Sequence, residues 1–189
     1  MKQISSENPL YTGYKIKVIA KGDEKIKLMP VINDVLKPAP NNKFLWMRPA
    51  LALNNTISES VKKKKFWKNK ISDPVLLSQT HPQQVSSAIQ NRVFHNGYFH
   101  NTVAFDTIYH GQRKIKYRYT ISLGEPYRFE SISFPIPQDD LTKKISDTRH
   151  ESLLKKGDIY TLDGIKNERS RIDLNLKETN STTIVSQSE

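Results

Sequence analysis

Three histidines lie close together in the chain and are the first candidates for chemistry. His95 and His100 flank an Asn-Gly turn, and His110 follows one strand length later. Metal binding would require imidazoles that converge with a carboxylate, and Asp106 is the near candidate for it. Histidines at turns are usually solvated surface residues, so we expect no metal ion and no other cofactor at this place.

The remaining polar residues fit catalysis no better. Asp139 and Asp140 could form a pair of carboxylates, but they precede an apolar helical pattern, where helix capping explains them better. No serine or threonine stands in a nucleophile-elbow context, and there is no glycine-rich phosphate loop. The chain has no cysteine, which excludes disulfides, thiolate metal sites and a thiol nucleophile. The sequence therefore predicts that the protein is not an enzyme.

Basic residues gather in two short segments that also contain aromatic residues. The first segment surrounds Phe66 and Trp67, and the second contains Tyr117 and Tyr119. Nucleic-acid-binding proteins use such a mixture for phosphate contacts and base stacking. Docking on anionic lipid headgroups or acidic partners, or a merely solvated face, explains it as well. The basic residues are Lys62, Lys63, Lys64, Lys65, Lys68, Lys70, Arg113, Lys114, Lys116 and Arg118.

The net charge of +11 is distributed unevenly over the 189 residues. Residues 1–124 contain 20 Lys and Arg against 7 Asp and Glu, whereas residues 125–189 contain 10 against 12. This asymmetry predicts two units, of which the first faces an anionic partner. No stretch approaches the roughly 20 apolar residues of a membrane helix, and no signal peptide is visible. We therefore expect a cytoplasmic protein, or one whose export signal lies outside this sequence.

The elements that would position these residues are clearest over residues 82–123. Helical spacing of apolar residues predicts a helix from Pro82 to the Asn96-Gly97 turn. A strand over 99–109 and a return strand over 113–123 follow, joined at Gly111. The return strand alternates, with basic and small polar residues on one face. Its other face consists of Ile115, Tyr117, Tyr119, Ile121 and Leu123.

The first third of the chain contains weaker patterns. Alternation predicts a short strand over residues 14–18, and an apolar pattern from Asp23 to Leu36 predicts a helix. Pro30 either kinks this helix or confines it to residues 31–36. Residues 44–53 fit a strand or an irregular extended segment, and residues 58–70 fit a basic amphipathic helix or a solvated connector.

After the boundary at Gly124-Glu125-Pro126, part of the same pattern begins again. A strand over 127–134, a helix up to Lys156-Gly157 and a helix capped by Thr161 are expected. The stretch before this last helix echoes the one before the helix at Pro82, so strand–helix–helix occurs twice. The second copy stops where its hairpin should start. Residues 1–9 and 178–189 are expected to be disordered.

Four sequence motifs of the chain resemble those of one known family. The order of elements, together with these motifs, resembles the POTRA (polypeptide-transport-associated) domains of BamA/TamA-like outer-membrane assembly factors, with a Bacteroidetes-type Pro-Ala-Pro-Asn segment. The motifs are Gly97-Tyr98-Phe99 with Val103, Gly124-Glu125-Pro126-Tyr127 with Phe129 and Ile132, Lys155-Lys156-Gly157-Asp158-Ile159-Tyr160, and Pro38-Ala39-Pro40-Asn41. The C-terminal β-barrel of that family is missing, and the Gly-Tyr-Tyr-like junction expected after Leu176 is replaced by Glu178-Thr179-Asn180-Ser181.

The resemblance implies an α+β fold in which two helices cover a three-stranded mixed sheet in the order β-α-α-β-β. It predicts a disordered lead (1–9), a POTRA-like domain (10–124) with an inserted basic segment (about 38–74), a second, incomplete POTRA-like domain (125–177) and a disordered tail (178–189). It also implies a non-catalytic periplasmic scaffold at the outer membrane. Its partners would be unfolded outer-membrane proteins or assembly-complex subunits; a basic α+β nucleic-acid-binding module is the alternative.

The expected binding site is a sheet edge. A three-stranded sheet under two helices leaves an edge that can accept an extended chain by β-augmentation. The alternative is an edge covered by its own loop or by a neighbouring domain. If the edge is free, Thr107→Pro or Ile108→Pro should abolish client capture with limited loss of fold. The expected edge residues are Phe99, Asn101, Val103, Phe105, Thr107 and Tyr109.

Overall fold

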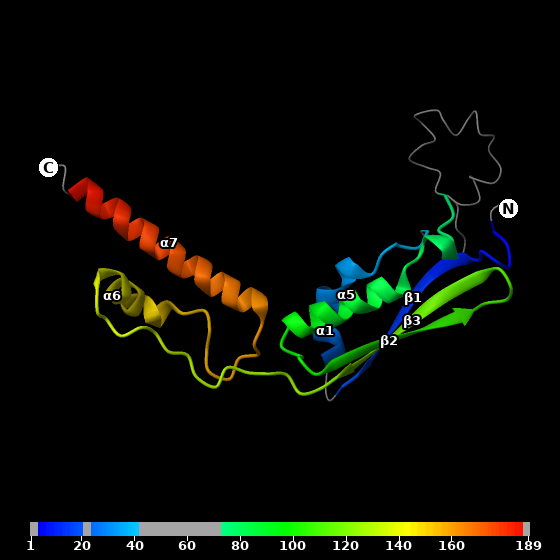
Figure 1. Ribbon diagram of the computed structural model, residues 1–189, viewed down its shortest axis with the longest axis horizontal. Helices are drawn as coiled ribbons and strands as arrows, with labels where there is room; N and C mark the ends of the chain where they lie inside the picture. The colour runs from blue at the N-terminus through cyan, green and yellow to red at the C-terminus, as the bar shows by residue number, and fades with distance from the viewer. Residues whose placement is uncertain (1–3, 21–23, 42–72, 187–189) are drawn as a thin grey trace, which may run out of the picture. The chain divides into compact units, whose positions relative to one another are not determined.

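The computed structural model describes residues 4–20, 24–41 and 73–186 (Figure 1). The ambiguous segment 44–53 and the lysines between Lys62 and Lys70 lie outside the described residues. The elements are β1 (Leu10–Ile19), α1 (Glu24–Ile32), the 3-10 turns η1 (Asn33–Val35) and η2 (Leu77–Gln79), α5 (Pro82–His95), β2 (Asn101–Tyr109), β3 (Lys114–Leu123), α6 (Asp140–Asp147), η3 (Thr148–Glu151) and α7 (Leu162–Ser186).

Contacts divide the chain into two compact units. The first unit comprises residues 1–92 and 101–123, and the second comprises 93–100 and 124–189. The sequence predicts a boundary between residues 124 and 125, and the division by contacts lies between residues 123 and 124. Residues 93–100, which comprise the last three residues of α5 and the turn after it, belong to the second unit.

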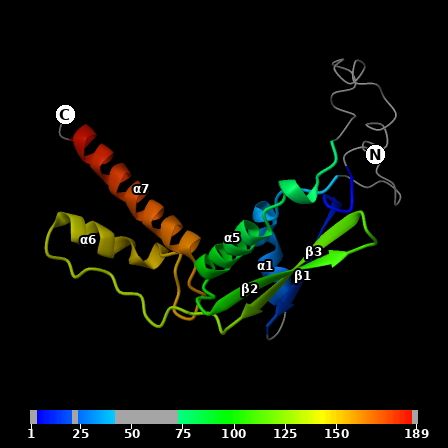
Figure 2. The ribbon, with the colours of Figure 1, turned by 45° about the vertical axis from the view of Figure 1, so that its right-hand side comes forward.

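The first unit contains a three-stranded mixed sheet with the strand order β1-β3-β2. β1 and β3 are parallel, and β2 and β3 form an antiparallel hairpin. Both α1 and α5 lie on one side of this sheet (Figures 1 and 2). The prediction of an α+β fold with a mixed three-stranded sheet and several helices is confirmed.

The core of the first unit lies between the sheet and its helices. The predicted apolar face of β3 is confirmed, because Ile115, Tyr117, Tyr119 and Ile121 are each at most 2% exposed. The Tyr117 hydroxyl lies 2.7 Å from the Thr80 hydroxyl, which satisfies both buried groups. Burial raises the pKa of Tyr117 above that of a free phenol, because the phenolate would lose its hydration. The other buried apolar residues of this unit are Ile4, Leu10, Tyr11, Leu28, Ile32, Leu36, Leu76, Val85 and Ile89.

Helix α1 contains Pro30 and still begins at Glu24. The alternative in which this proline confines the helix to residues 31–36 is therefore wrong. The proline stands near the end of the helix, and the chain tightens into η1 directly after Ile32. A proline so close to a helix end leaves most of the helix's hydrogen bonds intact.

The second unit is mainly helical in its described residues. Asp139 is the N-cap of α6 and accepts a hydrogen bond from the Thr142 amide at 2.7 Å, which confirms capping as the role of this acidic pair. The helix ends at Asp147, short of the expected Lys156-Gly157. The strand expected over 127–134 is reduced to one isolated bridge between Arg128 and Ile159. Without a hairpin beside it, this segment has no ladder to join.

Both ends of the chain are more ordered than the sequence suggests. Ile4 is 7% exposed and packs with Leu10 and Leu76, so residues 4–9 are not the disordered lead that we expect. At the other end, α7 continues to Ser186, although disorder is expected from residue 178. The segment 178–186 contains neither glycine nor proline, so no residue there stops a helix. No helix in the described ranges is both long enough and apolar enough to cross a membrane.

Candidate functional site

The strand order places β2 at one edge of the sheet. The amide of His110 donates to the carbonyl of Lys114 at 2.9 Å, one step beyond the last pair of the hairpin, Tyr109 and Ile115. In an antiparallel pair, hydrogen-bonded and non-hydrogen-bonded positions alternate. The even-numbered residues of β2 therefore bond to β3. The odd-numbered residues, which direct their main-chain N–H and C=O groups away from β3, are Asn101, Val103, Phe105, Thr107 and Tyr109.

Helix α5 covers part of this edge. The Ser86 hydroxyl donates to the carbonyl of Val103 at 3.1 Å, and the Gln90 side-chain amide donates to the carbonyl of Asn101 at 3.3 Å. Among the described residues, no main-chain partner occupies the outer side of Phe105 or Thr107. The predicted edge thus narrows to its second half, from Phe105 to Tyr109.

Phe99 does not belong to the edge strand, contrary to its assignment from the sequence. It precedes β2, which begins at Asn101, and lies in the second unit. Its ring packs against three aromatic rings, with centroids 4.7 Å from Phe94, 4.8 Å from Tyr127 and 5.4 Å from Tyr160. The residue therefore contributes to packing rather than to a free surface.

Gly97 of the Gly-Tyr-Phe motif has a structural role in the second unit. Its φ is +89°, and a Cβ atom at this position would lie 2.4 Å from the carbonyl oxygen of Tyr160 and 2.7 Å from a methyl carbon of Ile159. Its own carbonyl accepts a hydrogen bond from the Tyr127 amide at 2.8 Å. Glycine is required here by both backbone conformation and space.

The same backbone pattern occurs once in each unit. In both, three residues at the start of the unit form an antiparallel bridge with three residues that precede a long helix. The first unit has the bridge Leu10–Leu76 and the bonds Tyr11 N to Val75 O (2.8 Å) and Leu77 N to Pro9 O (3.0 Å). The second has the bridge Arg128–Ile159 and the bonds Phe129 N to Asp158 O (3.0 Å) and Tyr160 N to Tyr127 O (2.8 Å).

The solvent-facing side of the sheet is basic. Lys114, Lys116 and Arg118 of β3 alternate with the buried residues, as predicted. The parallel register places Lys15 of β1 opposite Arg118, and Lys17 follows on the same face, both exposed. We call these five residues the basic sheet face. Sequence reasoning did not include Lys15 and Lys17 in the basic surface; their alternation within a predicted strand was the available signal. The other predicted residue, Arg113, is exposed and precedes β3.

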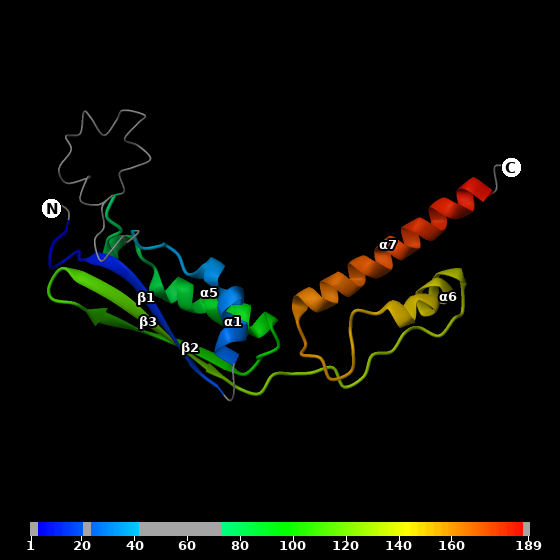
Figure 3. The same cartoon turned by 180° about the vertical axis from the view of Figure 1, so that it is seen from behind.

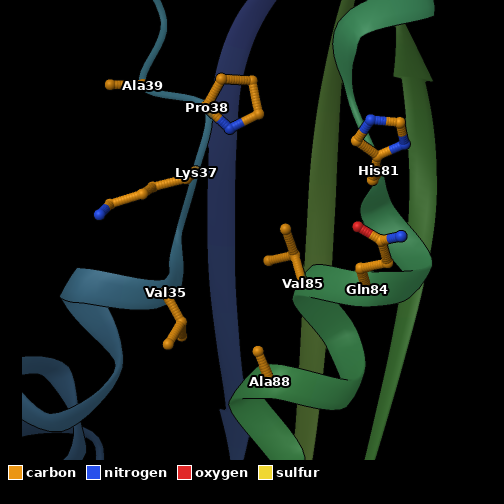
Figure 4. A pocket seen from close by; sticks show the side chains of 8 residues that line it. All are labelled: Val35, Lys37, Pro38, Ala39, His81, Gln84, Val85 and Ala88. Carbon is orange, nitrogen blue, oxygen red and sulfur yellow. The ribbon is translucent and has the colours of Figure 1, made fainter.

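An apolar groove of about 690 Å³ lies in the first unit between the segment around η1 and the start of α5 (Figure 4). Val35 and Pro38 line it from one side, and Val85 and Ala88 from the other, whereas the Lys37 side chain points away from α5. The remaining lining residues are Ala39, His81 and Gln84. This groove carries no pair of acid and base groups for catalysis.

The three candidate histidines are divided between the two units: His95 and His100 belong to the second and His110 to the first. His100 lies in the second unit, where its Nε2 atom is 3.0 Å from the Tyr127 hydroxyl. His110 follows β2, and Asp106 is an exposed residue within that strand. In the described part of the chain, no group of three or more metal-ligating side chains converges. The arrangement supports binding through the sheet better than chemistry at these side chains.

The protein therefore has an α+β fold with a three-stranded mixed sheet, an edge strand and a basic sheet face. No protein-family model and no curated protein matches this chain. Its function therefore has to be argued from the edge and the face themselves.

Proposed function

We propose that the first unit is a POTRA-like binding module that captures extended polypeptide at the β2 edge. Its partners are unfolded outer-membrane proteins or subunits of an assembly complex, and its location is the periplasm at the outer membrane. The observation that carries this proposal is the outward direction of the main-chain groups of Phe105 and Thr107. The order β1-α1-α5-β2-β3 and the Gly97-Tyr98-Phe99 motif support the family assignment.

The narrow edge suits weak and sequence-tolerant capture. An added strand would form main-chain hydrogen bonds at Phe105, Thr107 and Tyr109, and each such bond contributes about 1 kcal/mol net. Main-chain bonds do not depend on the client's side chains, so many extended sequences fit. Such a site favours transient handling of clients and requires no catalytic group.

The second unit is the start of a second POTRA-like copy. The shared bridge pattern at Leu10–Leu76 and Arg128–Ile159 supports this proposal. In the copy relationship, α7 corresponds to α5, and the described residues of the second unit contain no counterpart of the β2–β3 hairpin.

The test of the edge uses two prolines that the sequence alone treats as equivalent. The Thr107 amide points away from β3, so Thr107→Pro removes an outward donor and leaves the hairpin ladder intact. The Ile108 amide points toward β3 opposite Lys116, so Ile108→Pro breaks the ladder and damages the fold. The structure therefore corrects the expectation that both changes spare the fold.

The measurement is binding of a fluorescent peptide from a barrel strand of an outer-membrane protein to the full chain. We expect Thr107→Pro to reduce binding about five-fold, the equivalent of one lost bond of about 1 kcal/mol, with a nearly unchanged melting curve. Thr102→Ala, on the solvent-facing side of the same strand, is the control that keeps binding. Full binding by a folded Thr107→Pro variant would contradict the edge proposal.

The alternative function, a basic nucleic-acid-binding module, has the basic sheet face in its favour. However, Tyr117 and Tyr119 are each 2% exposed, so neither can stack on a base. Titration with single-stranded and duplex DNA at two salt concentrations separates the two functions. Tight and steeply salt-dependent binding would favour the nucleic-acid module.

A further inference from the structure

The basic sheet face brings together cations from two strands that lie about a hundred residues apart in the chain. Lys15 and Lys17 come from β1, and the parallel register sets them beside the β3 cations. Lys114 and Arg118 are four residues apart, which is about 13 Å along a strand, and neighbouring strands are about 4.8 Å apart. Lys17 lies beside Thr120, so the five cations form a row of roughly 20 Å in which neighbouring charges lie roughly 5–7 Å apart, within the Debye length of about 8 Å at physiological salt. They act on a partner as one field.

The neighbouring side chains of this patch narrow the kind of partner. Both helices of the first unit lie on the opposite side of the sheet, so no described element of that unit covers this face (Figures 1 and 3). The neighbours on the face are small or aliphatic: Ile19, Thr102, Ala104, Ile108, Thr120 and Ser122, with Asp106 as the acidic residue. Among the described residues of β1, β2 and β3, none that points to this face has an aromatic ring for base stacking.

We propose that the basic sheet face docks the first unit onto an anionic lipid surface. Four of its five cations are lysines, which act as mobile point charges and lack the planar fork that arginine offers to a fixed phosphate or carboxylate. A fluid layer of anionic headgroups matches such charges without requiring a fixed geometry. Ile19, which is 49% exposed, and the partly exposed Ile108 give the patch aliphatic contact at the depth of the headgroups.

This docking surface is separate from the β2 edge. The edge offers main-chain groups in the plane of the sheet, whereas the basic sheet face points perpendicular to that plane. A docked unit can therefore keep Phe105 and Thr107 accessible to an extended client. The two surfaces can fail independently, so Thr107→Pro is expected to leave lipid docking unchanged.

The experiment measures co-sedimentation of the full chain with vesicles that contain about one third phosphatidylserine in phosphatidylcholine. Each basic residue near an anionic surface contributes about a five-fold change in partitioning. We expect Lys15→Gln/Lys17→Gln to lower partitioning about 25-fold. The matched control is Lys155→Gln/Lys156→Gln, which removes the same charge from two exposed lysines of the second unit and should change partitioning less than three-fold. Lys114→Gln/Arg118→Gln should reproduce the loss.

Three results would overturn the proposal. The first is an absence of binding to the anionic vesicles at 0.15 M salt. The second is an equal loss in the Lys15/Lys17 variant and the control, since that would show a response to net charge alone. The third is tighter binding to duplex DNA than to vesicles at the same salt, lost in the Lys15/Lys17 variant, which would assign the face to nucleic acid.

Discussion

The two units start with the same bridge and hydrogen-bond pattern, yet they differ strongly in what they bury. In the first unit, Ile115 and Ile121 of β3 and Ile89 of α5 are fully buried. In the second, Val93 and Tyr98 are buried where α5 ends, but the only buried residue among residues 124–177 is Glu168, a charged one. Its large apolar residues remain open, with Leu141 54% exposed and Leu174 58% exposed.

The β2–β3 hairpin, and not the helix alone, therefore completes the core of the first unit. An amphipathic helix gains stability only when its apolar stripe is covered. In the first unit, β3 supplies that cover with four buried side chains, those of Ile115, Tyr117, Tyr119 and Ile121. The second unit has the initial strand segment and the helix but no described hairpin, and the apolar residues of α6 and α7 such as Leu141 and Leu174 stay exposed.

The largest expected effect is on the second unit in isolation. We predict that residues 127–177 alone unfold without a cooperative transition and bind a hydrophobic dye, because they bury too little apolar surface to offset chain entropy. Circular dichroism melting and dye fluorescence measure this. A sharp, cooperative melt of that fragment would show that the unit has a core of its own.

Single truncations to alanine sharpen the same comparison. Ile121→Ala removes a fully buried side chain of β3 and should lower the free energy of unfolding of the first unit by about 2–5 kcal/mol. Leu174→Ala in α7 should cost less than about 0.5 kcal/mol, since that side chain is 58% exposed. Hydrogen exchange resolved for β3 and α7 reports both. Comparable losses in the two units would contradict the contrast.

The sequence predicts the first unit well where the signal is local. The strict alternation from Lys114 to Leu123 fixes both the strand and its buried face, because basic and apolar residues separate completely. The membership of Lys15 in the basic sheet face depends on a parallel register across the chain, which no local pattern contains. The cover of the edge by Ser86 depends on how the helix lies over β2, which is equally non-local.

The second unit is predicted less well, for a related physical reason. Residues 127–134 have the pattern of a strand, but a strand needs a partner to complete its ladder, and only the bridge at Arg128 forms. Glu168 gives no sequence signal of burial, since glutamates on helices are usually solvated. Its role becomes visible only through Arg171 and the Leu153 amide, to which it bonds.

Substitutions of two glycines of the second unit distinguish the cost of steric crowding from the cost of backbone conformation. Gly97 and Gly157 have nearly equal φ values, +89° and +90°, but a Cβ atom at Gly157 meets nothing within 4 Å. Gly157→Ala should therefore cost about 1 kcal/mol for conformation alone. Gly97→Ala adds the clash with the Tyr160 carbonyl, so we expect a loss of about 3 kcal/mol. Denaturant melts of both variants measure the difference, and equal losses would contradict the close approach at Gly97.

A further prediction concerns the buried carboxylate of the second unit. Arg171 donates to Glu168 at 2.7 Å and the Leu153 amide donates to it at 2.8 Å. Glu168→Gln leaves the Arg171 charge less well paired and should cost about 2 kcal/mol. Glu151→Gln, which removes the exposed and more distant partner of Arg171 at 3.5 Å, is the control and should cost less than about 0.5 kcal/mol.

Residues with shifted pKa values make the stability of the second unit sensitive to acid and that of the first unit sensitive to alkali. The hydrogen bond from Arg171 holds the pKa of Glu168 below its ordinary value, so its contribution to stability is present above the unfolded pKa and is lost as pH falls through the folded pKa. Burial raises the pKa of Tyr11 and Tyr119, so the stability linked to them is complete below the unfolded pKa of about 10 and is lost as pH rises above it. Hydrogen-exchange protection should therefore weaken first in α7 at acid pH and first in β3 at alkaline pH. Loss of the acid sensitivity of α7 in Glu168→Gln, with β3 unchanged, assigns that response to this carboxylate.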